Sequence, residues 1–144
     1  MKITNTNKII IILFAIILGS MIGKLSVGTN QPNELSIDKA LMKMASEINK
    51  SCPFMVDENI RADNVTVLVD NTIQYNYTLI NYLKEEVDIN QLKSNLSSHL
   101  LNGIKTNPSL KIFRDNKVTM VYAYRDKVGV FLFSLEYKYE DYKK

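Results

Sequence analysis

The chain has 144 residues, which is enough for one folded domain after an N-terminal segment but not for two domains. Its net charge of +3 comes from Lys2, Lys8 and Lys24, because the first 28 residues hold no acidic side chain and the rest of the chain is electrically balanced. A neutral domain lacks the basic surface of nucleic-acid binding proteins, so we expect no nucleic-acid partner. The single cysteine, Cys52, excludes a disulfide within the chain.

Residues 9–28 form an apolar stretch that follows Lys2 and Lys8 and contains one charge, Lys24. A basic end followed by such a stretch is typical of a signal peptide or a short signal anchor, and we favour an uncleaved anchor over residues 1–28. Positive charge before the segment predicts a single-pass protein of the cell membrane. Its N-terminus would be cytoplasmic and its C-terminal domain extracytoplasmic, which means periplasmic in a Gram-negative cell.

Gly19 and Gly23 lie four residues apart in this stretch. Small residues at that spacing form the contact face of some membrane-helix dimers, so a homodimer through these glycines is one hypothesis. Glycine is also common in membrane helices that do not dimerise, which is the alternative.

Residues 29–35 are expected to be a polar linker, and residues 36–144 an extracytoplasmic domain. Apolar residues recur at helical spacing from Ser36 to Asn49, which predicts a helix with Ser36 as its N-cap. Pro53 prevents the helix from continuing.

The remainder of the domain alternates between strand patterns and one more helix. The predicted elements are a hairpin of Val65–Val69 and Thr72–Tyr82 around an Asp70-Asn71 turn, a helix of Ile89–Ile104, and a hairpin of Val118–Arg125 and Val130–Tyr137. The fold class is therefore α+β, with an N-terminal membrane helix followed by an α-β-β-α-β-β domain. We expect a four-stranded antiparallel sheet with two helices on one face.

Tyrosines are concentrated in the predicted strands. Tyrosine favours strands and packs across strand pairs, which is one explanation for this pattern. It also makes good contact surface, so the tyrosines are a candidate interaction surface on the sheet. The residues of this candidate surface are Tyr75, Tyr77, Tyr82, Tyr122 and Tyr124.

No catalytic, metal-binding or cofactor-binding motif stands out in the sequence, and we expect no enzyme activity and no cofactor. His99 is the only histidine and has no obvious partner for catalysis or metal binding, so a structural role is the better explanation. Cys52 follows the first predicted helix and precedes an apolar run, which favours burial.

The sequence CPFMVDENIRAD from Cys52 to Asp63, followed by YNYTL and later by TNP, resembles a family of small, uncharacterised bacterial proteins. These proteins are similar in a CPxxVDxxxRxD, YxYTL and TNP pattern. The first part of this motif includes five residues of unknown role: Cys52, Pro53, Asp57, Arg61 and Asp63. The resemblance implies a membrane-anchored or exported envelope protein.

The resemblance also implies a spatial relationship, because members of that family carry a cysteine where this chain has Lys105. We therefore expect Cys52 to lie near the end of the second helix. The element order is similar to that of BON domains, a likeness at the level of fold only.

Our leading hypothesis is a non-enzymatic, membrane-tethered extracytoplasmic interaction domain, an accessory of an envelope assembly with a protein partner. The alternative is a small-ligand or lipid-binding module that uses the tyrosine-rich face of the sheet.

Overall fold

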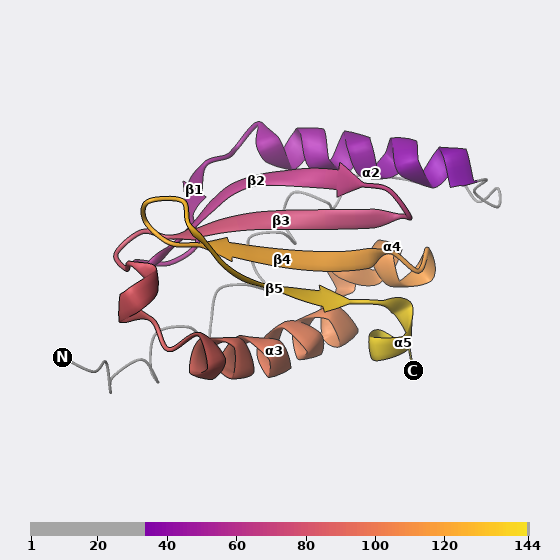
Figure 1. Ribbon diagram of the computed structural model, residues 1–144. Helices are drawn as coiled ribbons and strands as arrows, with labels where there is room; N and C mark the ends of the chain where they lie inside the picture. Colours follow the sequence, from indigo (N-terminus) through magenta and orange to yellow (C-terminus); the bar gives the residue numbers. More distant parts are fainter. Residues whose placement is uncertain (1–33, 144) are drawn as a thin grey trace.

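The structure is a computed structural model that describes residues 34–143. It is an α+β fold, as predicted, and Figure 1 shows its helices beside a central sheet. The elements in chain order are α2 (Glu34–Asn49), β1 (Phe54–Met55), β2 (Ile60–Leu68), β3 (Thr72–Leu79), the short 3-10 helix η2 (Lys84–Glu86), α3 (Ile89–Thr106), the short 3-10 helix η3 (Pro108–Leu110), α4 (Lys111–Asp115), β4 (Thr119–Arg125), β5 (Phe131–Tyr137) and α5 (Tyr139–Tyr142).

The helix α2 begins at Glu34, two residues before the predicted start, so Ser36 lies within the helix and is not its N-cap. Its buried side chains Leu41, Met44 and Ile48 recur at helical spacing and belong to the hydrophobic core. The helix packs along β2, at one edge of the sheet.

The sheet has five strands in the order β1-β2-β3-β4-β5, and β3 and β4 run parallel. The prediction of a four-stranded, fully antiparallel sheet is therefore wrong in strand number and in the direction of the central pair. The other neighbouring pairs are antiparallel, including both predicted hairpins.

The length of α3 explains why the central pair is parallel. This helix has 18 residues and so extends about 27 Å, close to the roughly 26 Å length of the eight-residue strand β3. The chain leaves β3 at one end of the sheet, returns along α3 to the other end, and enters β4 in the same direction as β3 (Figure 1). A crossover connection of this kind joins parallel strands.

The sequence analysis did not predict β1 or the register shift between β4 and β5. β1 has two residues, too few for a period-two pattern to be visible. β5 carries a register shift opposite Tyr124 and Arg125, so Phe131 does not continue the buried row that includes Phe133. Phe131 is exposed.

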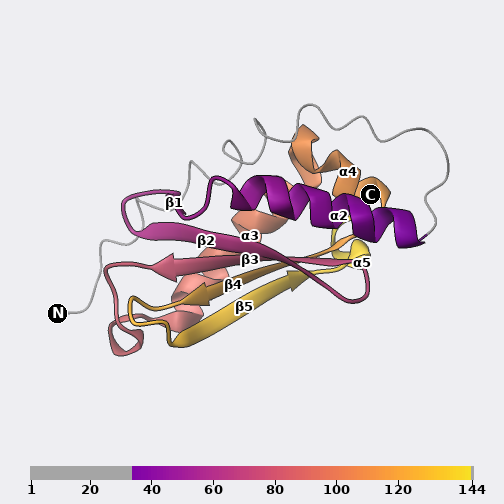
Figure 2. The same cartoon turned by 90° about the horizontal axis from the view of Figure 1, so that it is seen from above.

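Both long helices cover the same face of the sheet. The buried side chains of α2, α3 and α4 form one core cluster together with the tyrosines of β3 and β4. In Figure 2, α2 and α4 lie on one side of the picture and strands β3–β5 on the other. The core therefore lies between a sheet and a layer of helices.

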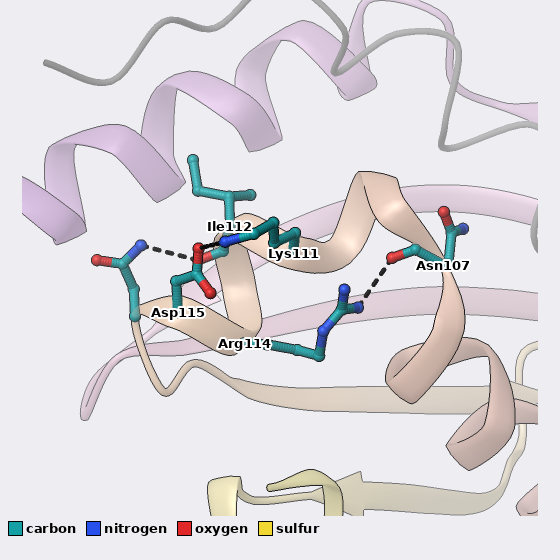
Figure 3. Close-up of polar contacts among 6 residues, drawn as sticks. Asn107, Lys111, Ile112, Arg114 and Asp115 are labelled. Carbon is teal, nitrogen blue, oxygen red and sulfur yellow. Dashed lines mark hydrogen bonds and ion pairs between the residues drawn. The ribbon is translucent and has the colours of Figure 1, made fainter. Parts of the chain in front are cut away.

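The end of α3 is held against α4 by one side chain. Arg114 donates hydrogen bonds from Nη1 to the carbonyl oxygens of Ile104 at 2.6 Å and Asn107 at 2.8 Å. Figure 3 shows the Arg114 guanidinium directed at the Asn107 carbonyl, and Lys111 paired with Asp115 on the same short helix. The Arg114 guanidinium therefore adds a charged donor to the carbonyl groups at the C-terminal end of α3.

Within residues 34–143, no helix is both long and apolar enough to cross a bilayer. The expected anchor over residues 1–28, its Gly19 and Gly23, and most of the linker lie outside the described residues.

Candidate functional site

The tyrosines of β3 and β4 form stacked pairs across the parallel strands. Tyr75 stacks on Tyr122 and Tyr77 stacks on Tyr124, each with ring centroids 5.3 Å apart. Tyr124 also stacks on Phe133 of β5 at 4.9 Å. In-register pairing places these residues opposite one another, so the period-two pattern and the strand order together produce the array.

This array lies inside the protein. Tyr75, Tyr77, Tyr122 and Tyr124 are between 0 and 3% exposed, and Tyr82, just beyond β3, is half-buried. The expectation that these tyrosines form an exposed interaction surface is therefore corrected: the helices cover the sheet face that carries them. Burial raises the pKa of all four phenols of the array above the ordinary value for tyrosine, because the charged phenolate is poorly solvated in the core.

Two of these hydroxyl groups are unusual for a core. The hydroxyls of Tyr75 and Tyr124 are fully buried, and among the described residues neither finds a hydrogen-bond partner. Burying a hydroxyl that has no hydrogen-bond partner costs free energy, because the group gives up its hydrogen bonds to water. By contrast, the Tyr137 hydroxyl donates to the Ser97 carbonyl of α3 at 2.9 Å.

The residues of the CPxxVDxxxRxD motif gather where the chain passes from α2 into β2. Asp57 accepts hydrogen bonds from the backbone N–H groups of Asn59 at 2.7 Å and Ile60 at 2.8 Å, which closes the turn before β2. This is the usual action of an aspartate at a turn. Pro53 is joined to Cys52 by a cis peptide bond and leads into β1.

Arg61 and Asp63 of the same motif act at a β-bulge. Asp63 lies at the register shift between Ala62 and Asn64, and its carboxylate accepts hydrogen bonds from Arg61 Nε and from Thr78 Oγ1, each at 2.5 Å. The Asp63 carboxylate therefore ties the bulged strand β2 to β3. Asp57, Arg61 and Asp63 of the motif thus shape a turn and a bulge.

Cys52 is half-buried against the core, less than the sequence suggested. Burial raises the pKa of its thiol, and the nearby Asp63 carboxylate raises it further. A thiol with a raised pKa is a poor nucleophile at neutral pH.

The expected proximity of Cys52 to Lys105 is wrong. The chain after α2 enters β1 at one end of the sheet, whereas the end of α3 leads to α4 at the opposite end, and both views agree (Figures 1 and 2). The hydrogen bonds from Arg114 hold residues 104–107 there. The two helices run in opposite directions, so their C-terminal ends cannot meet.

The His99 side chain is exposed on the surface of α3. Within the described part of the chain, no group of three or more His, Cys, Asp or Glu side chains is arranged to hold a metal ion.

Sequence reasoning missed the turn between β4 and β5, which is shaped by a buried carboxylate. Asp126 is 1% exposed, and its Oδ1 accepts hydrogen bonds from the N–H groups of Val128 at 3.0 Å and Val130 at 2.8 Å. Its Oδ2 accepts from the Lys84 N–H at 3.2 Å. Burial alone would raise the pKa of Asp126, but the backbone hydrogen bonds outweigh it and lower the pKa.

A backbone hydrogen bond from Lys127 N–H to the Tyr82 carbonyl, 3.0 Å long, fixes this turn from a second side. The turn holds Val128, Val130 and Phe131 in solvent, and we call these three residues the turn surface. Val128 is 67% exposed. Exposed apolar side chains on a firmly held turn are typical of a contact site, because little conformational freedom is lost on binding.

Solved structures with the same fold include one candidate secreted bacterial protein and two pilotins of bacterial secretion systems. A candidate secreted protein from Pseudomonas aeruginosa matches with a TM-score of 0.66 and 15% identity over 79% of this chain and 99% of that chain. The pilotin EpsS of the type 2 secretion system of Vibrio vulnificus matches with a TM-score of 0.61 and 9% identity, over 77% and 96% of the two chains. The type II secretion pilotin AspS of Vibrio cholerae gives 0.55 and 12%, over 73% and 91%.

No curated protein matches the sequence. A family model of a domain of unknown function, DUF8479, matches residues 36–133. That range covers more than half of the chain and extends from α2 into β5. The chain therefore belongs to the DUF8479 family.

Proposed function

We propose that the protein is a membrane-tethered extracytoplasmic interaction domain that acts, without catalysis, as an accessory of an envelope assembly. The observation that carries the proposal is the fold, which this chain shares with two secretion pilotins over more than 90% of their length. The apolar stretch of residues 9–28 after Lys2 and Lys8 supports the tether and the orientation.

The turn surface is the proposed contact site for a protein partner. Val128, Val130 and Phe131 are exposed, apolar and held on a turn that Asp126 fixes in place. The tyrosine array does not serve this role, because α2 and α3 cover it. A rigid apolar surface of only three residues is better suited to a small, reversible protein contact than to a permanent interface.

The tether and orientation are tested by fusing alkaline phosphatase or a fluorescent protein to the C-terminus of the full chain in a bacterial host. The proposal expects an active phosphatase and a dark fluorescent fusion, since the first reporter matures outside the cytoplasm and the second inside. Inactive phosphatase beside a fluorescent cytoplasmic fusion would contradict it.

The partner contact is tested by placing a photo-crosslinking amino acid at Val128 in cells. We expect a discrete adduct that is lost when Phe131→Asp is added. The same probe at Lys105, which is exposed near the end of α3, at the opposite end of the sheet from the β4–β5 turn, serves as the control. Equal adducts at both positions would show that Val128 has no special role.

The alternative function, binding of a small ligand within the tyrosine array, is favoured by one observation. The buried hydroxyls of Tyr75 and Tyr124 lack partners among the described residues, and a polar ligand group would satisfy them. Native mass spectrometry of the purified full chain tests this idea. A co-purified small molecule that is lost in the Y75F/Y124F variant would support it, and a bare chain would argue against it.

A further inference from the structure

The two ends of the sheet differ in what they present. The turn surface lies at the end where β4 leads into β5, whereas the β2–β3 turn lies at the opposite end, beside the start of α2 (Figures 1 and 2). At the tip of the β2–β3 turn, Leu68 is 43% exposed and Val69 is 81% exposed. We call these two residues the hairpin tip.

The hairpin tip is held firmly. Asp70 and Asn71 adopt left-handed backbone conformations, with φ of 56° and 52°, that define a tight turn. The Asn71 side chain donates to the Asn116 carbonyl at 2.8 Å, and the Asn71 carbonyl accepts from the Thr119 N–H at 3.0 Å. These contacts fix the backbone of the turn, so Leu68 and Val69 remain exposed to solvent.

The length of the chain before α2 limits what can lie next to this tip. Only residues 29–33 separate the apolar stretch from Glu34, and five residues extend to about 18 Å at most. If residues 9–28 occupy a bilayer, the start of α2 is held within that distance of the membrane. The hairpin tip lies at this same end of the domain (Figure 1).

We propose that the hairpin tip, Leu68 and Val69, rests in the interface of the membrane that holds the anchor. This proposal depends on the proposed tether. It fixes the orientation of the domain: the hairpin tip meets lipid, and the turn surface faces away, separated from the bilayer by roughly the 26 Å length of β3. Apolar side chains at an interface gain from leaving water, and the short linker brings them there at little cost in freedom.

The test uses the full chain with Cys52→Ser, so that one introduced thiol can carry an environment-sensitive fluorophore. The label is placed at Val69→Cys or, as a matched control at the opposite end, at Val128→Cys. Both are exposed valines in turns. Each protein is reconstituted into vesicles with and without nitroxide-labelled lipid, and flotation of the vesicles is measured on the same samples.

The proposal expects the chain to float with the vesicles, and expects nitroxide lipid to quench the label at position 69 and not at position 128. A Leu68→Cys label provides a second position if the first variant folds poorly by circular dichroism. A floating chain with an unquenched label at 69 overturns the proposal and leaves the tether intact. Equal quenching at both positions overturns the orientation, and a chain that does not float overturns tether and proposal together.

Discussion

At the scale of single residues, Asp126 has the clearest structural effect. One carboxylate accepts backbone hydrogen bonds from both sides of a turn and from the start of η2, and so brings together segments far apart in the sequence. Charged acceptors make stronger hydrogen bonds than neutral ones. The shape of the turn surface depends on this side chain.

We therefore expect D126N to unfold at a lower temperature than the wild type at pH 7, because the amide presents a donor where the carboxylate accepts. The folded state has the lower pKa for Asp126, so its contribution to stability is complete above the unfolded value of about 4 and is lost as the pH falls through the folded value. The difference in melting temperature should shrink as the pH falls below the unfolded value. The exposed Asp70→Asn is the control; a pH-independent difference for D126N would contradict this account.

Tyr124 offers a second prediction at this scale. Its buried hydroxyl has no partner among the described residues, so Tyr124→Phe should leave the free energy of unfolding unchanged or raise it. Tyr142→Phe is the matched comparison, because that hydroxyl donates to the Val118 carbonyl at 2.7 Å, and its loss should cost about 1 kcal/mol. Urea unfolding of both variants gives the answer. A clear destabilisation by Tyr124→Phe would contradict this account, because it would show that the hydroxyl has a hydrogen-bond partner in the folded protein.

At the residue scale, the sequence predicted the tyrosine rows but left their environment open. Alternation showed that Tyr75 and Tyr77 share a face, yet an apolar row on a sheet is equally suited to a core or to a contact surface. Only the packing of the helices decides between them. Asp126 was not foreseen, because a lone aspartate in a turn gives no sign of being buried.

At the scale of elements, the local patterns worked well. Both hairpins and both long helices are present, although β2 begins at Ile60, five residues before its predicted start. Asp70 and Asn71 have the positive φ angles of a tight hairpin turn. Elements that depend on distant neighbours were missed. β1 exists only because it pairs with β2, and α5 docks through Tyr142, which the charged tail did not suggest.

Asn49 shows how the edge of an element is protected. β1 pairs only with Arg61 and Ala62, so the outer edge of β2 has no partner strand at Val65. There the Asn49 side-chain amide donates to the Val65 carbonyl at 2.8 Å and accepts from the Val65 N–H at 2.7 Å, as a neighbouring strand would. Such protection keeps an edge strand from pairing with other chains.

We expect Asn49→Ala to lower the free energy of unfolding by about 1–3 kcal/mol, since two backbone groups of β2 lose their partner. The neighbouring Lys50→Ala removes an exposed ion pair with Glu47 and should change it by less than about 1 kcal/mol. Chemical denaturation measures both. Equal effects of the two substitutions would show that the amide does not stabilise this edge.

At the scale of the whole molecule, one core includes all the long elements, from α2 through β5. We therefore expect a fragment of residues 30–144 to fold without the apolar stretch and to unfold in one cooperative thermal transition, read by circular dichroism. A gradual loss of signal, without a transition, would show that the domain needs the N-terminal segment.

The direction of the central strands could not be read from the sequence. Two hairpins and two helices are compatible with either direction of the β3–β4 pair, and the choice rests on how far α3 carries the chain before β4 begins. The membrane tether and the partner depend on molecules outside the chain. A single sequence indicates a tether only through charge and hydropathy, and it does not identify a partner.

The parallel pairing of β3 with β4 also affects the order in which the protein can be completed. A chain is made from its N-terminus, and β3 is finished long before α3, α4 and β4 follow. During that interval one side of β3 keeps its backbone groups unpaired beside the N-terminal hairpin. A chain that stops at Asn116 should therefore remain in this incomplete state, and we expect it to self-associate during size-exclusion chromatography where the complete domain stays monomeric. Pairing of β4 with β3 is therefore the step that removes the exposed strand edge through which copies of the incomplete chain could associate.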